Sequence, residues 1–435
     1  MPGLNLRTAE LAVAAATREG ESTTNRSNES RMSPTAHLAA INFFTGDIQG
    51  GLGPFLSAWL AQTAEWSPAR IGLVTTVVGL ATIVLNGPAG ALADRTGRPR
   101  TLLCIACGAI LAGTLLLLPA RSFWAVLLAQ FTAAAGGTLL LPALTSLTLG
   151  IVGKDRFPQQ QGRNQAFNHA GILTAALLIG TGTNVLGPGA AFLILGGMAV
   201  AAITATVLTP ASAWNGRRAH GWQEDEPDEQ DRSHGVLAVL ADRRLLLLAA
   251  ALALFNLANG SLLSLLGQRL VDLGHDATAW TATYVIVAQL TMIPVALWAG
   301  SLCDKRGRRH LLLYACLALV VRAIMSALIT SPVWLIPAEI LDGIGAGLLG
   351  VAVPVLVADL TWGSGRTQTA LGTLNGLQGI GGALSGVFGG LLVRWLGWTW
   401  ALTALAIPAG AALALALWLE ETRDIEAPYV PRPAE

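Results

Sequence analysis

Long apolar stretches alternate with short polar ones along almost the whole chain. The apolar runs are about 20 residues long, which is the length an α-helix needs to cross about 30 Å of hydrocarbon. Ten-residue segments of alternating polarity, which are typical of membrane β-barrels, are missing from the sequence. The pattern therefore predicts an all-α membrane protein that crosses the bilayer many times.

Twelve spans can be counted, and one long hydrophilic segment separates the sixth from the seventh. The predicted spans are 37–61, 70–91, 100–119, 123–149, 164–187, 189–209, 243–267, 278–301, 309–330, 333–358, 367–393 and 398–419. The organisation that follows is a polar tail (1–36), a six-helix bundle (37–209), an acidic linker (210–242), a second six-helix bundle (243–420) and a second tail (421–435).

The basic residues are unevenly distributed between the two sides of the predicted membrane. With the N-terminus inside, 22 of the 27 lysines and arginines fall on the cytoplasmic side, 4 fall on the opposite side, and Arg322 lies within a span. Loops rich in basic residues stay in the cytoplasm. Both termini and the linker are therefore predicted to be cytoplasmic, in a multi-pass protein of the cell membrane.

The amino-acid composition limits the classes of function that this protein can have. Only 12% of the residues are charged, whereas soluble domains carry about 25%. The net charge of +1 gives no electrostatic reason to expect nucleic acid as a partner. The four cysteines lie within or at the edges of apolar runs, so we expect small packing residues there and no disulfide framework. No cofactor and no metal site is expected.

The two halves of the chain repeat each other. The segment "GALADRTGRPR" at 90–100 returns as "GSLCDKRGRRH" at 300–310, and "INFFTGD" at 41–47 matches "LFNLANGS" at 254–261. A third pair, 129–142 and 338–354, matches at nearly the same offset. Parallel six-helix repeats are the plan of a large class of transporters. The sequence therefore predicts two pseudo-symmetric six-helix bundles.

Over about residues 37–420 the sequence resembles the major facilitator superfamily. The resemblance rests on a G-x-L-x-D-[RK]-x-G-[RK] loop after the second span of each half. The first copy is carried by Gly90, Asp94, Arg95, Gly97 and Arg98, and the second by Gly300, Asp304, Lys305, Gly307 and Arg308. Two copies in equivalent loops make a specific signal.

In that family the loop closes the cytoplasmic side of the outward-facing state. The resemblance implies that Asp94 contacts the start of the eleventh span near Arg366, and that Asp304 contacts the start of the fifth near Arg163. A carboxylate is favoured at a helix N-terminus by the helix dipole. The fifth span lacks the Gly-Pro pair common in drug–proton antiporters, and Gln130 stands in the region where that group often has an arginine.

Polar side chains within the spans collect on the first, fourth, seventh and tenth helices, which the resemblance implies line a central cavity. The predicted substrate-binding and proton-binding residues are Asn42, Asp47, Gln49, Gln130, Asn256, Asn259, Glu339 and Asp342, with Asn375 beside them on the eleventh span. Polar groups inside a membrane are costly and are usually retained for function.

Asp47 lies about ten residues inside its span, roughly 15 Å deep at about 1.5 Å per residue. Hydrocarbon disfavours the charged form of a carboxylate, so Asp47 could take up and release a proton there. We interpret it as a coupling or substrate-binding residue; the alternative is a carboxylate held by a structural hydrogen bond. Arg322 and Asp342 lie at similar depth on adjacent spans and are predicted to form an ion pair. Glu339 is then the second candidate for protonation or substrate contact.

These observations predict a secondary transporter that works by alternating access on a small organic solute. We expect proton-coupled export by a monomer in the lipid bilayer, with a polar or amphipathic substrate. Proton-coupled uptake and uniport are alternatives, and a non-transporting receptor on the same fold is a weaker one. An enzyme is not expected, because no cluster of His, Asp or Glu at catalytic spacing occurs in the sequence.

Overall fold

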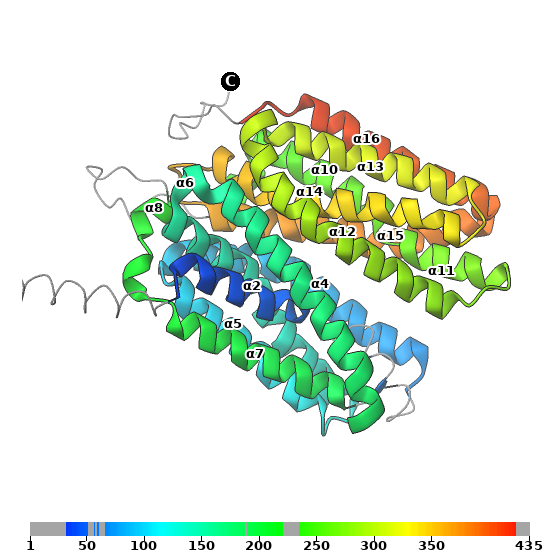
Figure 1. The fold of residues 1–435 in the computed structure, drawn as a ribbon, viewed down its shortest axis with the longest axis horizontal. Helices are drawn as coiled ribbons and strands as arrows, with labels where there is room; N and C mark the ends of the chain where they lie inside the picture. The colour runs from blue at the N-terminus through cyan, green and yellow to red at the C-terminus, as the bar shows by residue number, and fades with distance from the viewer. Residues whose placement is uncertain are drawn as a thin grey trace, which may run out of the picture.

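The computed structural model describes residues 32–50, 56, 59–60, 66–187, 189–220 and 235–422, and the regular structure in these ranges is helical (Figure 1). The helices before the linker are α2 (Pro34–Gly50), α4 (Pro68–Thr96), α5 (Pro99–Leu117), α6 (Phe123–Leu186) and α7 (Ala190–Leu208). Two short elements follow at the start of the linker, η1 (Ala211–Ala213) and α8 (Gly216–His220).

The second half begins with the short helix α9 (Val236–Leu240) at the end of the linker. The helices that follow it are α10 (Arg243–Asn259), α11 (Leu262–Asp272), α12 (Ala277–Arg306), α13 (Arg308–Leu328), η2 (Val333–Leu335), α14 (Ile336–Leu360), α15 (Thr367–Ala404) and α16 (Ala406–Trp418). The predicted seventh span is thus divided between α10 and α11.

Within the described ranges, nine helical stretches are long and apolar enough to cross a membrane. Two of them, Phe123–Gly182 and Thr367–Trp418, have 60 and 52 residues. At about 1.5 Å per residue, each is far longer than one crossing of about 30 Å requires. Each therefore corresponds to two predicted spans. Together with α2, which covers most of the described residues of the first span, the helices agree with the twelve that the sequence predicts.

Glycine makes the sharp changes of direction possible. Gly153 in α6 and Gly397 in α15 have φ of 74° and 73°, a region that L side chains rarely adopt. Each glycine marks a kink between two helices, at the boundary between two predicted spans. Gly97 and Gly307, which come from the two copies of the loop motif, also have positive φ, at 55° and 92°. They end α4 and separate α12 from α13.

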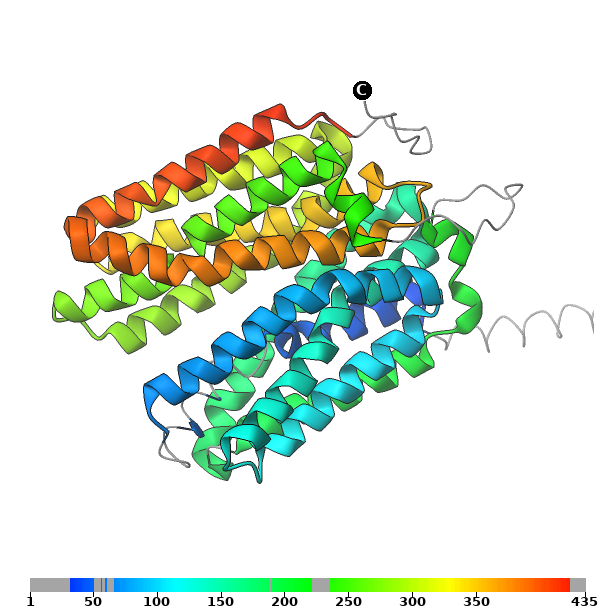
Figure 2. The same ribbon diagram turned by 180° about the vertical axis from the view of Figure 1, so that it is seen from behind.

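The helices form two groups, which are seen in both views (Figures 1 and 2). One group consists of α2 and α4–α7, and the other of α10–α16. Each group has its own apolar core, with Leu103 and Phe192 buried in the first and Leu248 and Leu374 in the second. This is the arrangement of two bundles that the sequence repeat predicts.

The two groups cross closely at two places, and glycine lies on both sides of each crossing. At the crossing of α4 and α15, a Cβ added to Gly90 or Gly372 would overlap backbone atoms of the facing helix. The same holds for Gly162 and Gly300 where α6 crosses α12. Both crossings lie toward the end of the molecule that carries the two loop motifs, which we call the motif end. The groups diverge toward the opposite end (Figure 2).

The first residues of the predicted linker are attached to the first group. The indole Nε1 of Trp214 donates to the carbonyl of Ser146 (3.1 Å), and the backbone N–H of Asn215 donates to the carbonyl of Gly150 (3.1 Å). A Cβ on Gly150 would overlap the Trp214 ring, so the absence of a side chain there creates the recess in which the indole lies. The acidic core of the linker, residues 221–234, lies outside the described residues, and the predicted domain boundaries stay predictions.

At the motif end, the segment after α16 caps α13. The N-cap residue of α13 is Gly307, which has no side chain to accept hydrogen bonds from the first helical turn. Glu421 takes this role, because its Oε1 accepts from the backbone N–H of Arg308 (2.8 Å) and its Oε2 from that of Arg309 (3.3 Å). A carboxylate at this position also complements the helix dipole.

Replacing Glu421 with alanine is expected to lower the free energy of unfolding by about 1 kcal/mol, the usual effect of losing a helix cap. Thermal unfolding of the purified protein in detergent would measure it. Glu420→Ala is the matched control, since the neighbouring Glu420 is 67% exposed and pairs with the exposed Arg244. Exposed pairs contribute little to stability. Equal effects of the two substitutions would show that the cap does not stabilise α13.

Candidate functional site

The first motif loop places Asp94 against the start of α15. Its Oδ1 accepts a hydrogen bond from the backbone N–H of Gln368 (3.1 Å), and its Oδ2 accepts from both the backbone N–H and the hydroxyl of Thr369 (2.7 Å each). The first N–H groups of a helix have no partner within the helix and attract negative charge. Asp94 therefore fastens α4 to α15 next to Arg366, where the motif implied that it would lie.

The aspartate of the second motif loop makes fewer contacts in the described part of the chain than Asp94 does. Asp304 Oδ2 accepts one hydrogen bond, from the side-chain amide of Gln159 at 3.3 Å. Gln159 lies one helical turn before Arg163, whose guanidinium lies 5.8 Å from the centre of the Phe167 ring. The aspartate thus reaches the implied part of α6, but through a side chain instead of helix-end N–H groups.

The basic residues of the two motifs have different surroundings. Arg95, Arg98 and Lys305 are exposed, whereas Arg308 is buried with its Nε 3.0 Å from Asp359 Oδ2. Sequence reasoning missed Asp359. The helix dipole makes a carboxylate in the last turn of α14 unfavourable unless a cation pairs with it, and this signal could have found the pair.

A buried charged cluster joins α10, α13 and α14. It consists of Arg322, Glu339, Asp342 and Asn259, and we call it the Arg322 cluster. Arg322 Nη1 donates to Asp342 Oδ1 (2.7 Å) and to Asn259 Oδ1 (2.5 Å), and Nη2 donates to Glu339 Oε2 (2.9 Å). The Arg322 side chain is 1% exposed. One guanidinium therefore connects three helices of the second group.

The Arg322 cluster contains one basic and two acidic side chains. Oε1 of the buried Glu339 has no hydrogen-bond partner among the described residues. Asp342 is 17% exposed, which makes it the charged member that a solvent molecule or a ligand can reach. With both carboxylates ionised the cluster has an excess of one negative charge. Uncompensated charge is unfavourable in a buried site.

The sequence predicts an ion pair between Arg322 and Asp342, and the structure brings these two side chains together. It also brings Glu339, which the sequence kept as a separate candidate, onto the same guanidinium. Residues three apart in a helix share a face, so the spacing of Glu339 and Asp342 could have indicated a shared partner. Asn259 was predicted as a binding residue, and here it accepts a hydrogen bond from Arg322.

Other predicted binding residues lie apart from this cluster in the described contacts. Asn42 and Asn256, which the repeat aligns, each donate from Nδ2 to a carbonyl one turn earlier on their own helix, at 2.8 Å to Leu38 and 3.0 Å to Leu252. Nε2 of Gln130 is buried and has no partner among the described residues. In this conformation the side-chain amides of the two asparagines therefore donate hydrogen bonds within their own helices.

The structure does not test the predicted roles of three further binding residues. Asp47 and Gln49 lie near the end of α2, but their side chains are outside the described residues. Asn375 is partly exposed on α15. The roles that the sequence gave to these residues stay predictions.

Polar side chains of α6 contact the second group along one helix face. His169 Nδ1 and Gln289 Oε1 of α12 lie 2.9 Å apart, within hydrogen-bond distance. Two turns away, Gln161 Nε2 donates to the carbonyl of Gly350 on α14 (3.2 Å). Sequence reasoning did not pair these residues. They show that hydrogen bonds contribute to the contact between the groups where α6 meets α12 and α14.

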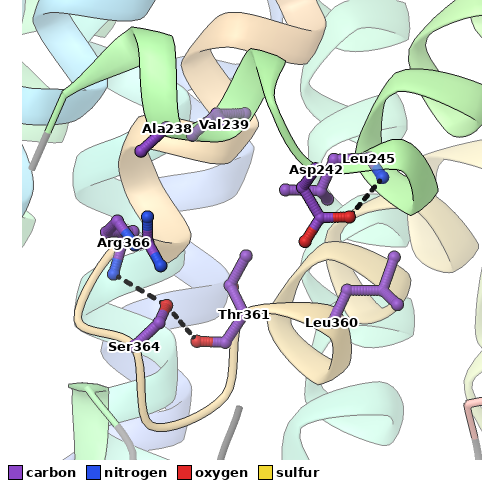
Figure 3. A pocket seen from close by; sticks show the side chains of 8 residues that line it. All are labelled: Ala238, Val239, Asp242, Leu245, Leu360, Thr361, Ser364 and Arg366. Carbon is purple, nitrogen blue, oxygen red and sulfur yellow. Dashed lines mark hydrogen bonds between the residues drawn. The ribbon is translucent and has the colours of Figure 1, made fainter. Parts of the chain in front are cut away.

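A small pocket lies at the motif end between α9, the start of α10 and the turn before α15 (Figure 3). Its polar side chains stabilise local turns. Asp242 Oδ1 accepts from the backbone N–H of Leu245 (3.4 Å), and the Ser364 hydroxyl donates to the carbonyl of Thr361 (2.6 Å). This pocket is separate from the Arg322 cluster. Across the described ranges, no group of three or more His, Cys, Asp or Glu side chains could hold a metal ion.

Comparison with known proteins identifies the family of this architecture. The family model described as Major Facilitator Superfamily matches residues 38–376. An uncharacterized MFS-type transporter of Mycobacterium tuberculosis is 35% identical over 400 residues, which cover 91% of this chain and 95% of the relative. Multidrug resistance protein D of Escherichia coli is 30% identical over a shorter segment, 30% of this chain and 34% of the relative.

Solved structures of the same superfamily share the fold. The transporter FucP in the outward conformation aligns with a TM-score of 0.66 at 17% identity, over 90% of this chain and 99% of that one. The proton:xylose symporter XylE aligns with a TM-score of 0.69 at 12% identity, over 90% of this chain and 97% of that one. Similarity at this identity concerns the arrangement of the helices alone.

Proposed function

The chain belongs to the Major Facilitator Superfamily, and from this premise we propose that it exports a small organic solute across the cell membrane in exchange for protons. The two helix groups would rock about a site between them, so that the site opens to one side of the membrane at a time. This is how transporters built from two repeats generally work.

The motif end is the cytoplasmic end in this proposal. Support comes from the basic residues, of which 22 of 27 lie in the tails and loops assigned to that side. The contacts of Asp94 with α15 and the glycine crossings hold the groups together there. The conformation described here would then be outward-facing, and inward opening would require these contacts to break.

The observation that carries the proton-coupling proposal is the composition of the Arg322 cluster. A guanidinium with two carboxylates has one negative charge too many for a buried site, and binding of one proton would neutralise it. Asp342 provides the access that proton exchange needs. Asp47 is the second proposed proton-binding residue, from its depth in the first span.

Proton movement in proteoliposomes tests this function. Vesicles with a pH-sensitive dye inside would receive a panel of small metabolites and drugs that includes anions, neutral compounds and cations. In the wild-type protein, at least one compound is expected to move protons, in the direction opposite to its own movement. Glu339→Gln and Asp47→Asn are each expected to lower the coupled proton flux at least tenfold, because neither side chain could then release a proton.

Glu420→Gln, which changes an exposed carboxylate, is the matched control and should retain the flux. Compound and protons moving in the same direction would support uptake in place of export. Transport without any proton movement in the wild-type protein would contradict proton coupling. An unchanged flux in Asp47→Asn would make Asp47 a structural carboxylate and leave the Arg322 cluster as the coupling site.

A further inference from the structure

The charges inside the membrane are strongly unbalanced. Away from the ends of the predicted spans the sequence has one arginine, no lysine, one histidine and three acidic residues, which are Arg322, His169, Asp47, Glu339 and Asp342. Ionisable residues at such positions mark the paths of substrates and ions. Their balance therefore has consequences for the charge of the substrate.

Arg322 is not available to bind an anion. Its Nη1 and Nη2 groups already donate to Asn259, Asp342 and Glu339 at 2.5–2.9 Å, and its side chain is 1% exposed. Its Nε is enclosed by the protein, with no partner among the described residues. An anionic substrate would have to displace a carboxylate from the guanidinium and leave that carboxylate buried without a partner, which is unfavourable.

The electrostatics of the cluster favour a cationic substrate. The cluster has one carboxylate in excess of its guanidinium, and Oε1 of the fully buried Glu339 has no partner among the described residues. Asp342, which shares the helix face with Glu339, is accessible from outside the cluster. A positive charge placed beside Asp342 would neutralise the cluster as a proton does.

The face of α14 that carries Asp342 is otherwise apolar. Ala346, Leu349 and Val353 follow Asp342 at helical spacing on α14, and all four residues are partly exposed. Leu349 and Val353 also pack against the apolar core of the second group. A ligand lying along this face would meet a carboxylate at one end and aliphatic side chains over the rest.

From this geometry we infer that the substrate is a small amphipathic organic cation, such as a quaternary ammonium or phosphonium compound, bound with its charge at Asp342. The inference rests on the proposed proton exchange. When the cation binds, one proton leaves the Glu339–Asp342 pair for water on the open side. The net charge of the cluster, counted together with the bound proton or cation, is the same before and after. The proton and the cation therefore compete for the same site.

Two ions of equal shape and opposite charge test the inference without transport. Binding of tetraphenylphosphonium and of tetraphenylborate to the full-length protein in detergent would be measured by equilibrium dialysis, with proton release followed in weakly buffered solution. The cation is expected to bind at least tenfold more tightly than the anion, to release about one proton per bound cation, and to bind more weakly as the pH falls.

Asp342→Asn is expected to weaken cation binding at least tenfold and to abolish proton release, whereas Asp342→Glu should restore both. The Asn variant keeps the Arg322–Glu339 pair, so it should fold, and its thermal unfolding would confirm this. Glu420→Gln is the control for loss of a carboxylate elsewhere. Equal or tighter binding of the anion, cation binding without proton release, absence of cation binding, or unchanged binding in Asp342→Asn would each overturn the inference.

The two proposals fail in different ways. If a neutral or anionic compound drives proton movement in the proteoliposomes while tetraphenylphosphonium does not bind, the coupled transporter stands and the cationic substrate is wrong. If no compound of any charge moves protons, coupling is wrong, and the cation inference falls with it because its proton exchange is lost.

Discussion

Replacing Arg322 with methionine is expected to lower the free energy of unfolding by about 3–5 kcal/mol, the usual effect of removing one partner from a buried ion pair. The substitution keeps much of the side-chain volume but leaves Glu339 and Asp342 side by side without a cation. It also removes the hydrogen bonds that join α10, α13 and α14. Chemical or thermal unfolding in detergent, followed by circular dichroism, would measure the loss.

A triple variant distinguishes the effect of unpaired charges on stability from the effect of altered packing. Combining Arg322→Met with Glu339→Gln and Asp342→Asn removes all three charges, and most of the lost stability should return. Well-packed uncharged side chains often replace a buried ion pair at little loss of stability. An Arg322→Met protein within about 0.5 kcal/mol of the wild type, the range of ordinary surface substitutions, would contradict the burial of the cluster.

Replacing Gly90 with alanine is expected to shift the protein toward the conformation that is open at the motif end and to reduce transport. A Cβ at this position would overlap the backbone of Gln368, so α4 and α15 would have to separate. Overpacking of this kind costs about 1–3 kcal/mol. A change of that size moves an equilibrium between two conformations by about 5- to 150-fold.

Distances between spin labels would measure this shift. Labels at Arg95 and Arg306, both exposed at the motif end and in different groups, should move apart in Gly90→Ala. The four native cysteines would first be replaced by alanine or serine. Gly79→Ala is the matched control on the same helix, because a Cβ there would meet nothing within 4 Å. The same distances in both variants would mean that the crossing of α4 and α15 tolerates the side chain.

The helices and their duplication were predictable because both leave local signals in the sequence. Runs of apolar residues mark the spans, and the two copies of the loop motif mark the halves. The glycines at which α6 and α15 kink were not predictable. A single glycine at 153 or 397 looks like any other glycine in a glycine-rich sequence, and no local pattern marks it for a positive φ.

The contacts of the site were predictable only in part. The pairing of Arg322 with Asp342 follows from opposite charges at similar depth on neighbouring spans. The cap that Glu421 forms on α13 joins residues more than a hundred positions apart, and no local pattern marks it. The hydrogen-bond distance between His169 and Gln289 depends in the same way on how the two groups approach each other.

The attachment of Trp214 and Asn215 to α6 shortens the covalent connection between the two groups. The chain is held to the first group up to about residue 220 and continues as α9 at Val236, so residues 221–234 form the connecting segment. Fully extended, such a segment reaches about 50 Å at 3.3–3.6 Å per residue. This length is an upper limit on how far the start of α9 can lie from the end of α8. In the proposed alternating-access cycle, the balance between the open and closed forms would depend on contacts between the groups, such as those of Asp94 and Gly90.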